Sequence, residues 1–321
     1  MRLVILTEAG FEIGFGHFVR MSALGSELST RGVQVVTYLN ADVVARRSLD
    51  LKHMTLAAWN SQRFIANHVS SSDVVLVDSY HVNEEFLRWV RSKAGKLMIV
   101  DDNVRLNYEG VTIINPNYFA EWLQYPTGRG NVYLLGKDYT MLRKPFEFTG
   151  KRVVGKRVNK VLVTLGGTDV KGVTVKVIRR IREVDQSVSL RVVVTDAYRN
   201  LTAIPAELND SDKLVINASA QEMRDLMLEV DFAVSAAGGT SNELIKMQCP
   251  SALLVVADNQ NNTHLLHEHG LVDLLTLNDD SALLRMFTYK NRMQLVDSMA
   301  KRSSNKCAAD AIASLMKGIG D

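Results

Sequence analysis

Short runs of apolar residues recur along the chain, and the stretches between them carry apolar residues spaced three and four apart. Within the runs the apolar residues do not alternate with polar ones, which is typical of strands buried on both faces of a parallel sheet. The runs span residues 3–6, 35–39, 74–77, 97–100 and 112–114, and then 161–164, 192–194, 214–216, 232–234 and 252–256. Between the runs, apolar residues have the spacing of a helix, for example in residues 21–31 and 221–229. This alternation predicts doubly wound α/β layers.

The length of the chain and one basic segment predict two domains. At 321 residues the chain suits two domains of ordinary size. Residues 143–160 contain two Gly-Lys-Arg triplets just before a new strand. We interpret this segment as a solvated linker; the alternative, attraction to an anionic lipid surface, would need an apolar face beside it. We therefore expect an N-terminal domain of residues 1–148 and a C-terminal domain of residues 149–321.

Composition excludes several classes of protein. The hydrophobic fraction of 46% is that of an ordinary globular protein, and a net charge of +3 is too small to predict nucleic acid as a partner. Cys249 and Cys307 have no metal-type spacing, so neither a disulfide scaffold nor structural zinc is expected. The first apolar run is interrupted at Glu8, too early for a signal peptide, and no run has the ~18 apolar residues of a membrane span. We expect a cytoplasmic protein without stable membrane insertion.

A glycine-rich turn with a histidine follows the first predicted strand. It reads Gly14-Phe15-Gly16-His17 and continues to Arg20. The start of a helix disfavours a positively charged imidazole, so a neutral His17 could act as a general base. The alternative is a histidine that packs in the turn and bonds to nearby backbone. The two glycines before His17 and the arginine after it favour a functional role.

A second glycine-rich turn, Gly238-Gly239-Thr240, follows the strand predicted at residues 232–234. Glycines allow backbone N–H groups to approach a ligand closely, and the start of a helix attracts phosphate. Glu243 lies one turn further on, where it could accept hydrogen bonds from a ribose or merely complete a helix cap. Together the two turns predict an enzyme that acts on a nucleotide-linked substrate in a cleft between two domains.

Further polar residues follow other predicted strands, at the edge where α/β sheets bind ligands. Asp78-Ser79-Tyr80-His81 and Asp101-Asp102 could provide oxygen ligands for magnesium, although capping of helices and strand ends is the favoured interpretation. Tyr80 is a candidate for contact with substrate. Gly166-Gly167 forms another turn of the same kind, and the amides of Asn259-Gln260 could orient sugar hydroxyl or acetamido groups.

The combined motifs resemble those of a known family. They are GFGHFVR at residues 14–20, VDSY at 77–80, VDD at 100–102, GKDYTMLRKPF at 136–146, LGGTD at 165–169, SAAGGTSNEL at 235–244 and DNQ at 258–260. In this order they resemble the UDP-sugar hydrolases of the pseudaminic-acid pathway and the SpsG-like spore-coat polysaccharide proteins. Both lie within the GT-B group that includes MurG. One departure is Phe15, because many relatives place a small residue between the two glycines.

The resemblance implies two Rossmann-like domains of the GT-B type, with UDP held by the C-terminal domain and the base supplied by the N-terminal domain. It assigns catalytic roles to His17, Tyr80 and Asn259, and uracil contact to the backbone around Ala218. The residues expected to bind UDP or substrate are Gly14, Gly16, Arg20, Gly166, Gly167, Ala218, Gly238, Gly239, Thr240, Glu243 and Gln260.

The implied reaction is hydrolysis of a UDP-linked amino sugar, with UDP-2,4-diacetamido-2,4,6-trideoxy-β-L-altropyranose as the leading substrate. His17 would take a proton from a water molecule that attacks the anomeric carbon with inversion, and the glycine turn at 238–239 would stabilise the departing diphosphate. No metal or other cofactor is expected, nor any partner besides the UDP-sugar, and we expect a monomer. The alternatives are an inverting GT-B glycosyltransferase, a UDP-N-acetylhexosamine epimerase and a non-catalytic nucleotide-sugar-binding protein.

Overall fold

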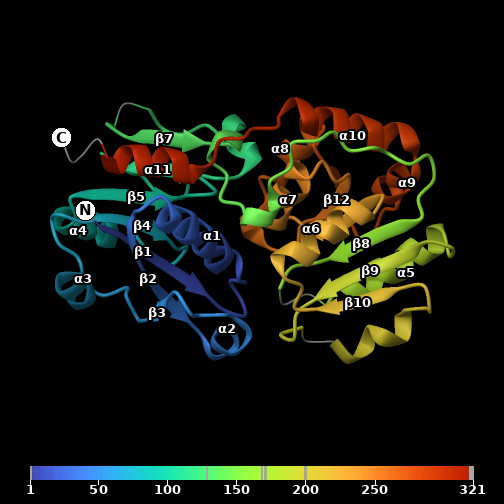
Figure 1. Cartoon of the computed structure of the whole chain (residues 1–321), viewed down its shortest axis with the longest axis horizontal. Helices are drawn as coiled ribbons and strands as arrows, with labels where there is room; N and C mark the ends of the chain where they lie inside the picture. Colours follow the sequence, from blue (N-terminus) through green and yellow to red (C-terminus); the bar gives the residue numbers. More distant parts are fainter. Residues whose placement is uncertain (1, 128, 168, 170–171, 199–200, 318–321) are drawn as a thin grey trace. The chain divides into compact units, whose positions relative to one another are not determined.

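The computed structural model describes residues 2–127, 129–167, 169, 172–198 and 201–317. The chain divides into two compact units (Figure 1). The first unit comprises Met1–Arg143 and Ser304–Asp321, and the second comprises Lys144–Ser303. Among the described helices, none combines the length and the apolar character needed to cross a bilayer.

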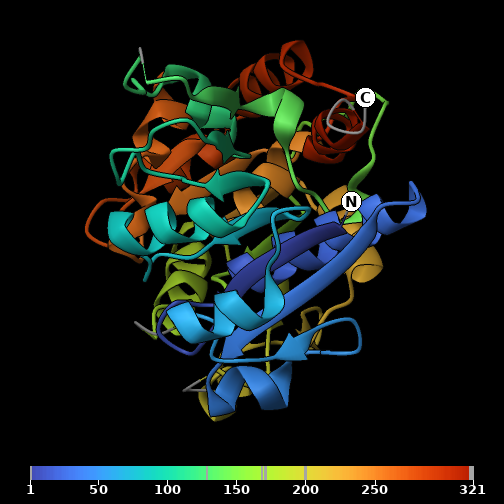
Figure 2. The same ribbon diagram turned by 90° about the vertical axis from the view of Figure 1, so that its left-hand side faces the viewer.

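The first unit is built on a parallel sheet with the strand order β3-β2-β1-β4-β5-β6-β7. The strands are β1 (Arg2–Ala9), β2 (Gln34–Ala41), β3 (Thr55–Leu56), β4 (Val74–Asp78), β5 (Lys96–Val100), β6 (Thr112–Asn115) and β7 (Val132–Leu135). Figure 2 turns this unit toward the viewer, and the long strands β1 and β2 are seen side by side, as their parallel pairing requires. The predicted apolar runs of this unit all form strands, and those in β1, β4, β5 and β6 are buried, as expected, whereas β2 is only partly buried. The short strands β3 and β7 were not predicted.

Both faces of the central strands of this sheet are covered, which explains why the apolar runs of β1, β4 and β5 are unbroken. Successive residues of a strand point to opposite faces. Leu3 and Ile5 accordingly lie in a core that includes residues of α1 (Gly16–Thr30), whereas Val4 and Leu6 lie in a separate core. The second core receives residues from the helices on the other face, α3 (Gln62–His68) and α4 (Glu84–Lys93). A further short helix, α2 (Val43–Ser48), follows β2.

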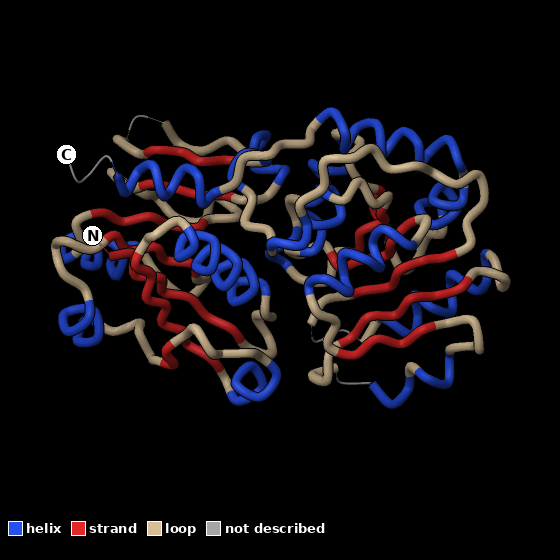
Figure 3. Tube along the Cα trace, in the orientation of Figure 1, coloured by secondary structure: helices blue, strands red, loops and turns tan. Residues whose placement is uncertain are grey.

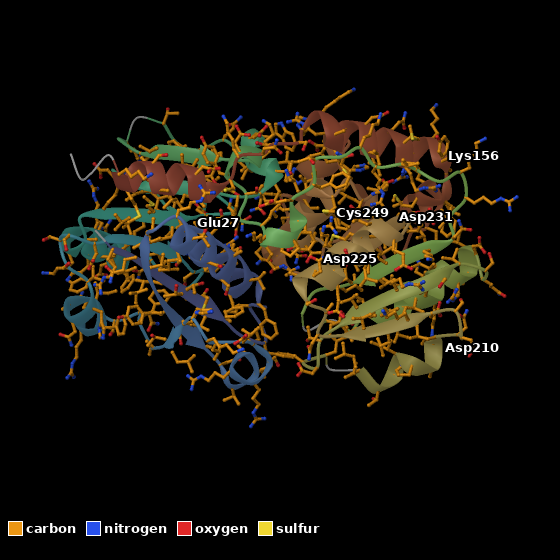
Figure 4. The ribbon with its side chains drawn as sticks, in the orientation of Figure 1. Glu27, Lys156, Asp210, Asp225, Asp231 and Cys249 are labelled. Atoms are coloured by element: carbon orange, nitrogen blue, oxygen red, sulfur yellow. The ribbon has the colours of Figure 1, made fainter. Side chains whose placement is uncertain are left out.

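The last helix, α11 (Ala308–Lys317), belongs to the first unit. Its residue Ile312 lies in the same core as Leu24 and Leu28 of α1. Arg31 at the end of α1 bonds both to Asp310 of α11 and to Glu27, which is labelled in Figure 4. The single boundary expected after residue 148 therefore assigns this segment to the wrong half of the chain. The apolar face of α11 is buried against α1, and local sequence does not reveal such a distant partner.

A charge placed on this buried face should destabilise the first unit. Ile312 is fully buried, so we expect Ile312→Asp to lower the free energy of unfolding by about 3 kcal/mol or more, because the carboxylate loses its hydration. The matched control is Ser314→Asp, which adds the same charge on an exposed position of the same helix. Chemical denaturation measures both, and equal effects of the two substitutions would contradict the packing of α11 on α1.

The second unit repeats the architecture with the strand order β10-β9-β8-β11-β12-β13, again all parallel. The strands are β8 (Lys160–Thr164), β9 (Ser189–Val194), β10 (Lys213–Ile216), β11 (Phe232–Ala236), β12 (Ser251–Leu254) and β13 (Asp273–Leu275). The helices are α5 (Thr174–Val184), α6 (Ala220–Glu229), α7 (Thr240–Lys246), α8 (Thr263–Glu268), α9 (Ser281–Phe287) and α10 (Tyr289–Lys301). Figure 3 shows strands alternating with helices along this part of the chain, as the sequence predicts.

The two sheets share a topology that, in open α/β sheets, is associated with a ligand-binding edge. In each, the first strand of the unit lies beside the fourth, so the chain winds outward in opposite directions from this pair. Ligands of open α/β sheets bind in the crevice outside the carboxyl ends of such a strand pair. The pair is β1 and β4 in the first unit, and β8 and β11 in the second. Each glycine-rich turn of the sequence follows one of these four strands.

Candidate active site

The loop between β1 and α1 places His17 at the carboxyl end of the sheet. It turns back on itself through a bond from the N–H of Gly10 to the carbonyl of Gly14, 3.2 Å long. Gly14 has a φ of 77°, a conformation that favours glycine. The carboxylate of Asp42 fixes the loop by accepting the N–H of Phe11 at 2.7 Å. Helix α1 then begins at Gly16, so His17 lies in its first turn, as predicted.

His17 is held by a buried carboxylate. Its Nδ1 atom lies 2.7 Å from Oδ1 of Asp78, the last residue of β4, and the two side chains are 4% and 0% exposed. Burial alone would raise the pKa of Asp78, but the neighbouring Arg20 and His17 outweigh it and hold that pKa well below its usual range. Asp78 is therefore an ionised acceptor at neutral pH.

This contact determines which ring nitrogen of His17 carries the proton. Two atoms approach Nδ1: the Asp78 carboxylate at 2.7 Å and Nη2 of Arg20 at 3.1 Å. An ionised carboxylate can only accept, so the shorter contact requires a proton on Nδ1, and the arginine cannot then donate to it. The lone pair is consequently on Nε2, for which no hydrogen bond is found among the described residues. A neutral His17 in this tautomer can accept a proton through Nε2.

Arg20, one turn further along α1, connects two carboxylates. Its Nε and Nη2 atoms donate to Asp78 at 2.7 and 2.5 Å, and its Nη1 lies 2.9 Å from both carboxylate oxygens of Asp102. Burial opposes the positive charge, yet the two carboxylates raise the pKa of Arg20. The expectation that Arg20 binds the substrate gains no support from these contacts, because its donors point at protein groups.

Tyr80 completes the surroundings of His17. Its hydroxyl group donates to Oδ2 of Asp102 at 2.6 Å, and its ring meets the His17 ring edge-on, with centroids 4.5 Å apart. Burial and the charge of Asp102 raise the pKa of Tyr80 above its usual range. The phenol therefore stays protonated at neutral pH, and its proton is directed at Asp102. This geometry supports packing against His17 rather than acid or base chemistry by Tyr80.

Sequence reasoning identifies His17 and Tyr80 but assigns no role at the site to Asp78 or Asp102. It favours caps for both carboxylates, with magnesium ligands as the alternative. In the structure they bind His17, Arg20 and Tyr80, and Asn117 also donates to Asp102 at 2.7 Å. The sequence feature that could have identified Asp78 and Asp102 is their position directly after predicted parallel strands. It indicates the correct edge of the sheet but not the pairing partners.

In the second unit the glycine-rich segments gather at the carboxyl edge of the sheet. Gly166 and Gly167 follow β8, and Gly238 and Gly239 follow β11, the neighbouring strand. Gly166 has a φ of 89°. Apart from its own chain neighbours, no atom of the residues that the structure describes lies within 4 Å of where a Cβ of Gly239 would be, and Gly239 is exposed. The backbone at Gly239 is therefore uncovered at the point where α7 begins.

Side chains expected to bind ligand lie around this second turn. The Oε1 atom of Gln260 accepts the N–H of Val256 at 2.9 Å, which leaves the Nε2 atom of Gln260 facing Gly238. The neighbouring Asn259 is exposed. Glu243 lies in the first turn of α7 and is 5% exposed.

Two further expected residues lie at the same edge of the second sheet. Thr240 is the first residue of α7. Ala218 follows the end of β10, after Asn217, whose φ of 56° is unusual for a residue with a side chain. The residues predicted to bind nucleotide therefore share the carboxyl edge of one sheet. Asn259, predicted to be catalytic, belongs to the second unit, whereas His17 belongs to the first.

The chain is similar in sequence to three curated proteins, although no family model matches it. A Helicobacter pylori protein named pseudaminic acid cytidylyltransferase and UDP-2,4-diacetamido-2,4,6-trideoxy-beta-L-altropyranose hydrolase is 26% identical over 263 residues, which is 81% of this chain and 45% of that protein. The Bacillus subtilis spore coat polysaccharide biosynthesis protein SpsG is 24% identical over 274 residues, 82% of this chain and 80% of SpsG.

An uncharacterized protein of Methanocaldococcus jannaschii is 23% identical over 268 residues, 79% of this chain and 55% of that protein. The chain thus spans about half the length of the H. pylori and M. jannaschii relatives.

Solved structures match the whole chain. MurG of Acinetobacter baumannii aligns over 99% of this chain and 100% of its own, with a TM-score of 0.61 and 15% identity. The spinosyn rhamnosyltransferase SpnG aligns over 100% of both chains, with a TM-score of 0.67 and 11% identity. With two parallel doubly wound sheets and these structural neighbours, the chain has the two-domain GT-B fold.

Proposed function

We propose that this protein is an enzyme that hydrolyses a UDP-linked amino sugar to the free sugar and UDP, with inversion at the anomeric carbon. The observation that carries the proposal is the buried pair of His17 and Asp78, with Nδ1 on the carboxylate at 2.7 Å and Nε2 left as a proton acceptor. Such a pair is the arrangement by which a protein sets the tautomer of a general base.

In this mechanism the water oxygen bonds to the anomeric carbon while Nε2 of His17 takes one of its protons. The bond between the anomeric carbon and the β-phosphate oxygen breaks, and its electron pair leaves with UDP. Asp78 stabilises the imidazolium that forms but keeps its own ionised state. UDP is a good leaving group, so the mechanism needs no strong general acid.

The second unit would bind the UDP. Backbone N–H groups at Gly238 and Gly239 and the start of α7 would meet the negative charge that develops on the diphosphate. The amide Nε2 of Gln260 faces Gly238 and could add a side-chain donor. Glu243 would accept hydrogen bonds from the ribose, and the backbone at Ala218 would contact the uracil.

The proposed substrate class is supported by the relatives that are similar over most of this chain. Their names refer to a UDP-2,4-diacetamido-2,4,6-trideoxy sugar and to a coat polysaccharide. We therefore propose a UDP-linked diacetamido sugar, with the altropyranose compound first, and a role in making surface polysaccharide or nonulosonic acid. Transfer of the sugar to an acceptor hydroxyl is the second candidate, because the neighbouring solved structures include glycosyltransferases and the same base can activate either nucleophile.

Release of UDP from a panel of UDP-amino sugars, measured without any acceptor, tests the proposal. We expect fast release from at least one diacetamido sugar, with free sugar of inverted anomeric configuration in the first NMR spectra. Tight UDP binding without release until an acceptor is added would favour transfer. UDP binding with neither activity would favour a binding protein and would contradict the proposal.

We also expect UDP release to persist after chelation of divalent metals, because N–H donors of the second glycine turn would replace a cation at the diphosphate. The measurement compares initial rates with EDTA and with added magnesium. A loss of activity in EDTA that magnesium restores would contradict the proposed use of backbone donors alone.

A further inference from the structure

We propose that Arg20 is a positioning residue that holds the His17 ring in place through Asp78 and Asp102, and that it does not bind the substrate. This inference rests on the proposed role of His17 as the base. It assigns a separate task to an arginine that the sequence pattern placed among the ligand-binding groups.

The guanidinium group fills the space between the two supports of His17. One support is Asp78, which accepts hydrogen bonds from Nε and Nη2 of Arg20 at 2.7 and 2.5 Å. The same carboxylate also accepts a hydrogen bond from Nδ1 of His17. The other is Asp102, which accepts hydrogen bonds from Nη1 of Arg20 at 2.9 Å and from the hydroxyl group of Tyr80 at 2.6 Å. The ring of Tyr80 in turn contacts the ring of His17. One planar cation therefore sets the spacing between Asp78, which bonds to His17, and Asp102, which holds Tyr80 against it.

The charges make Arg20 necessary for this arrangement. The side chains of Asp78 and Asp102 are 0% and 7% exposed, and two such carboxylates repel each other unless a cation lies between them. Arg20 supplies that cation with a flat fork whose separate arms reach different carboxylates. A lysine has the charge but presents it as a single point, so it cannot reproduce both contacts.

The same contacts leave Arg20 little capacity for a ligand. Its Nε donates to Asp78, its Nη1 faces both oxygens of Asp102, and its Nη2 lies against Asp78 and beside His17. Its side chain is 16% exposed. Binding a phosphate through Arg20 would require it to release a buried carboxylate, which is costly.

Chemical rescue tests the proposal in the whole protein. We expect Arg20→Ala to lower kcat by on the order of 10²-fold, since a small displacement of a catalytic group costs about that much, with little change in UDP affinity. Guanidinium ion at millimolar concentration should restore a saturable part of kcat, whereas urea should not. Arg20→Lys should stay impaired. A fall in UDP affinity that accounts for the loss of activity would overturn the proposal and make Arg20 a ligand-binding residue.

The matched control is Arg31→Ala. Arg31 follows the last residue of the same helix and also bonds to two carboxylates, those of Glu27 and Asp310, but it is away from His17. The side chains of these partners are 36% and 50% exposed (Glu27 is labelled in Figure 4). We expect this variant to keep its kcat and to show no response to guanidinium. Melting curves of all three variants separate a loss of folded protein from a loss of turnover.

A second readout does not depend on activity. Nitrogen NMR of the His17 ring reports which nitrogen is protonated, and the expected signal is an Nδ1–H bonded to a carboxylate in the wild type. Arg20→Ala should weaken or broaden this signal, and guanidinium should restore it. An unchanged signal in a folded Arg20→Ala variant would overturn the proposal. Absence of UDP release by the wild type would count against the proposed function alone.

Discussion

Replacing His17 with alanine is expected to lower the rate of UDP release by roughly 10²–10⁴-fold, the usual contribution of general-base catalysis. UDP affinity should change little, because the proposed UDP contacts lie in the second unit and His17 belongs to the first. The measurement is kcat for UDP release beside a binding isotherm for UDP. This separation is expected because a base acts on the attacking water and only weakly on the bound nucleotide.

The matched control for His17→Ala is His53→Ala, which removes an exposed histidine from the same unit. It should retain the wild-type rate. If His17→Ala weakened UDP binding as much as it lowered turnover, the role of His17 as a base would be wrong, and binding of the diphosphate would be the better assignment.

Replacing Asp78 with asparagine is expected to be nearly as damaging to turnover, by roughly 10²–10⁴-fold, although the new side chain has the same shape. An amide can donate a hydrogen bond to Nδ1, which would favour the proton on Nε2 and remove the acceptor that a base needs. The imidazolium formed during the reaction would also lose its counter-charge. Steady-state kinetics and nitrogen NMR of the His17 ring measure the two effects.

The Asp78→Asn substitution should also lower the free energy of unfolding at neutral pH, by about 3 kcal/mol, because it breaks a buried ionic network. Arg20 and His17 hold the pKa of Asp78 well below its unfolded value, against the effect of burial. The stabilisation is therefore present above pH ~4 and is lost as the pH falls toward the pKa of the folded state. The difference between wild type and variant should shrink on acidification.

Asp50→Asn is the matched control for this substitution, since Asp50 is exposed in the same unit. It should change neither turnover nor the free energy of unfolding at neutral pH by a measurable amount. A normal rate in Asp78→Asn with the Nδ1–H signal retained would contradict the assigned tautomer of His17.

Much of the site was predictable because its signals are local. The turn at Gly14–His17 and the turn at Gly238–Gly239 each follow a strand with an unbroken apolar run, and in both cases a helix begins within the turn or directly after it. Glycine is favoured where the backbone adopts a positive φ, as at Gly14, so such a turn leaves its mark on the amino-acid sequence itself. The edge strand β13 begins at Asp273, which interrupts the apolar residues around it, whereas the apolar run of β7 was present in the sequence but was not assigned to a strand.

The pairing of charges was not predictable. His17 and Asp78 are separated by 61 residues, and Arg20 and Asp102 by 82. A carboxylate after a strand can cap a helix, bind a metal or hold a histidine, and these alternatives have the same local sequence. The choice among them depends on which other loops reach the same edge of the sheet. That is a property of strand order, because β1 lies beside β4 and β4 beside β5.

The sequence by itself determined the parallel α/β class, the two glycine turns and the histidine in the first turn of the first helix, because apolar runs and glycine requirements act over a few residues. Only the tertiary structure decided that Arg20 binds two carboxylates and that α11 returns to the first unit. Both depend on surfaces brought together from distant parts of the chain, where burial and charge are balanced among several elements at once.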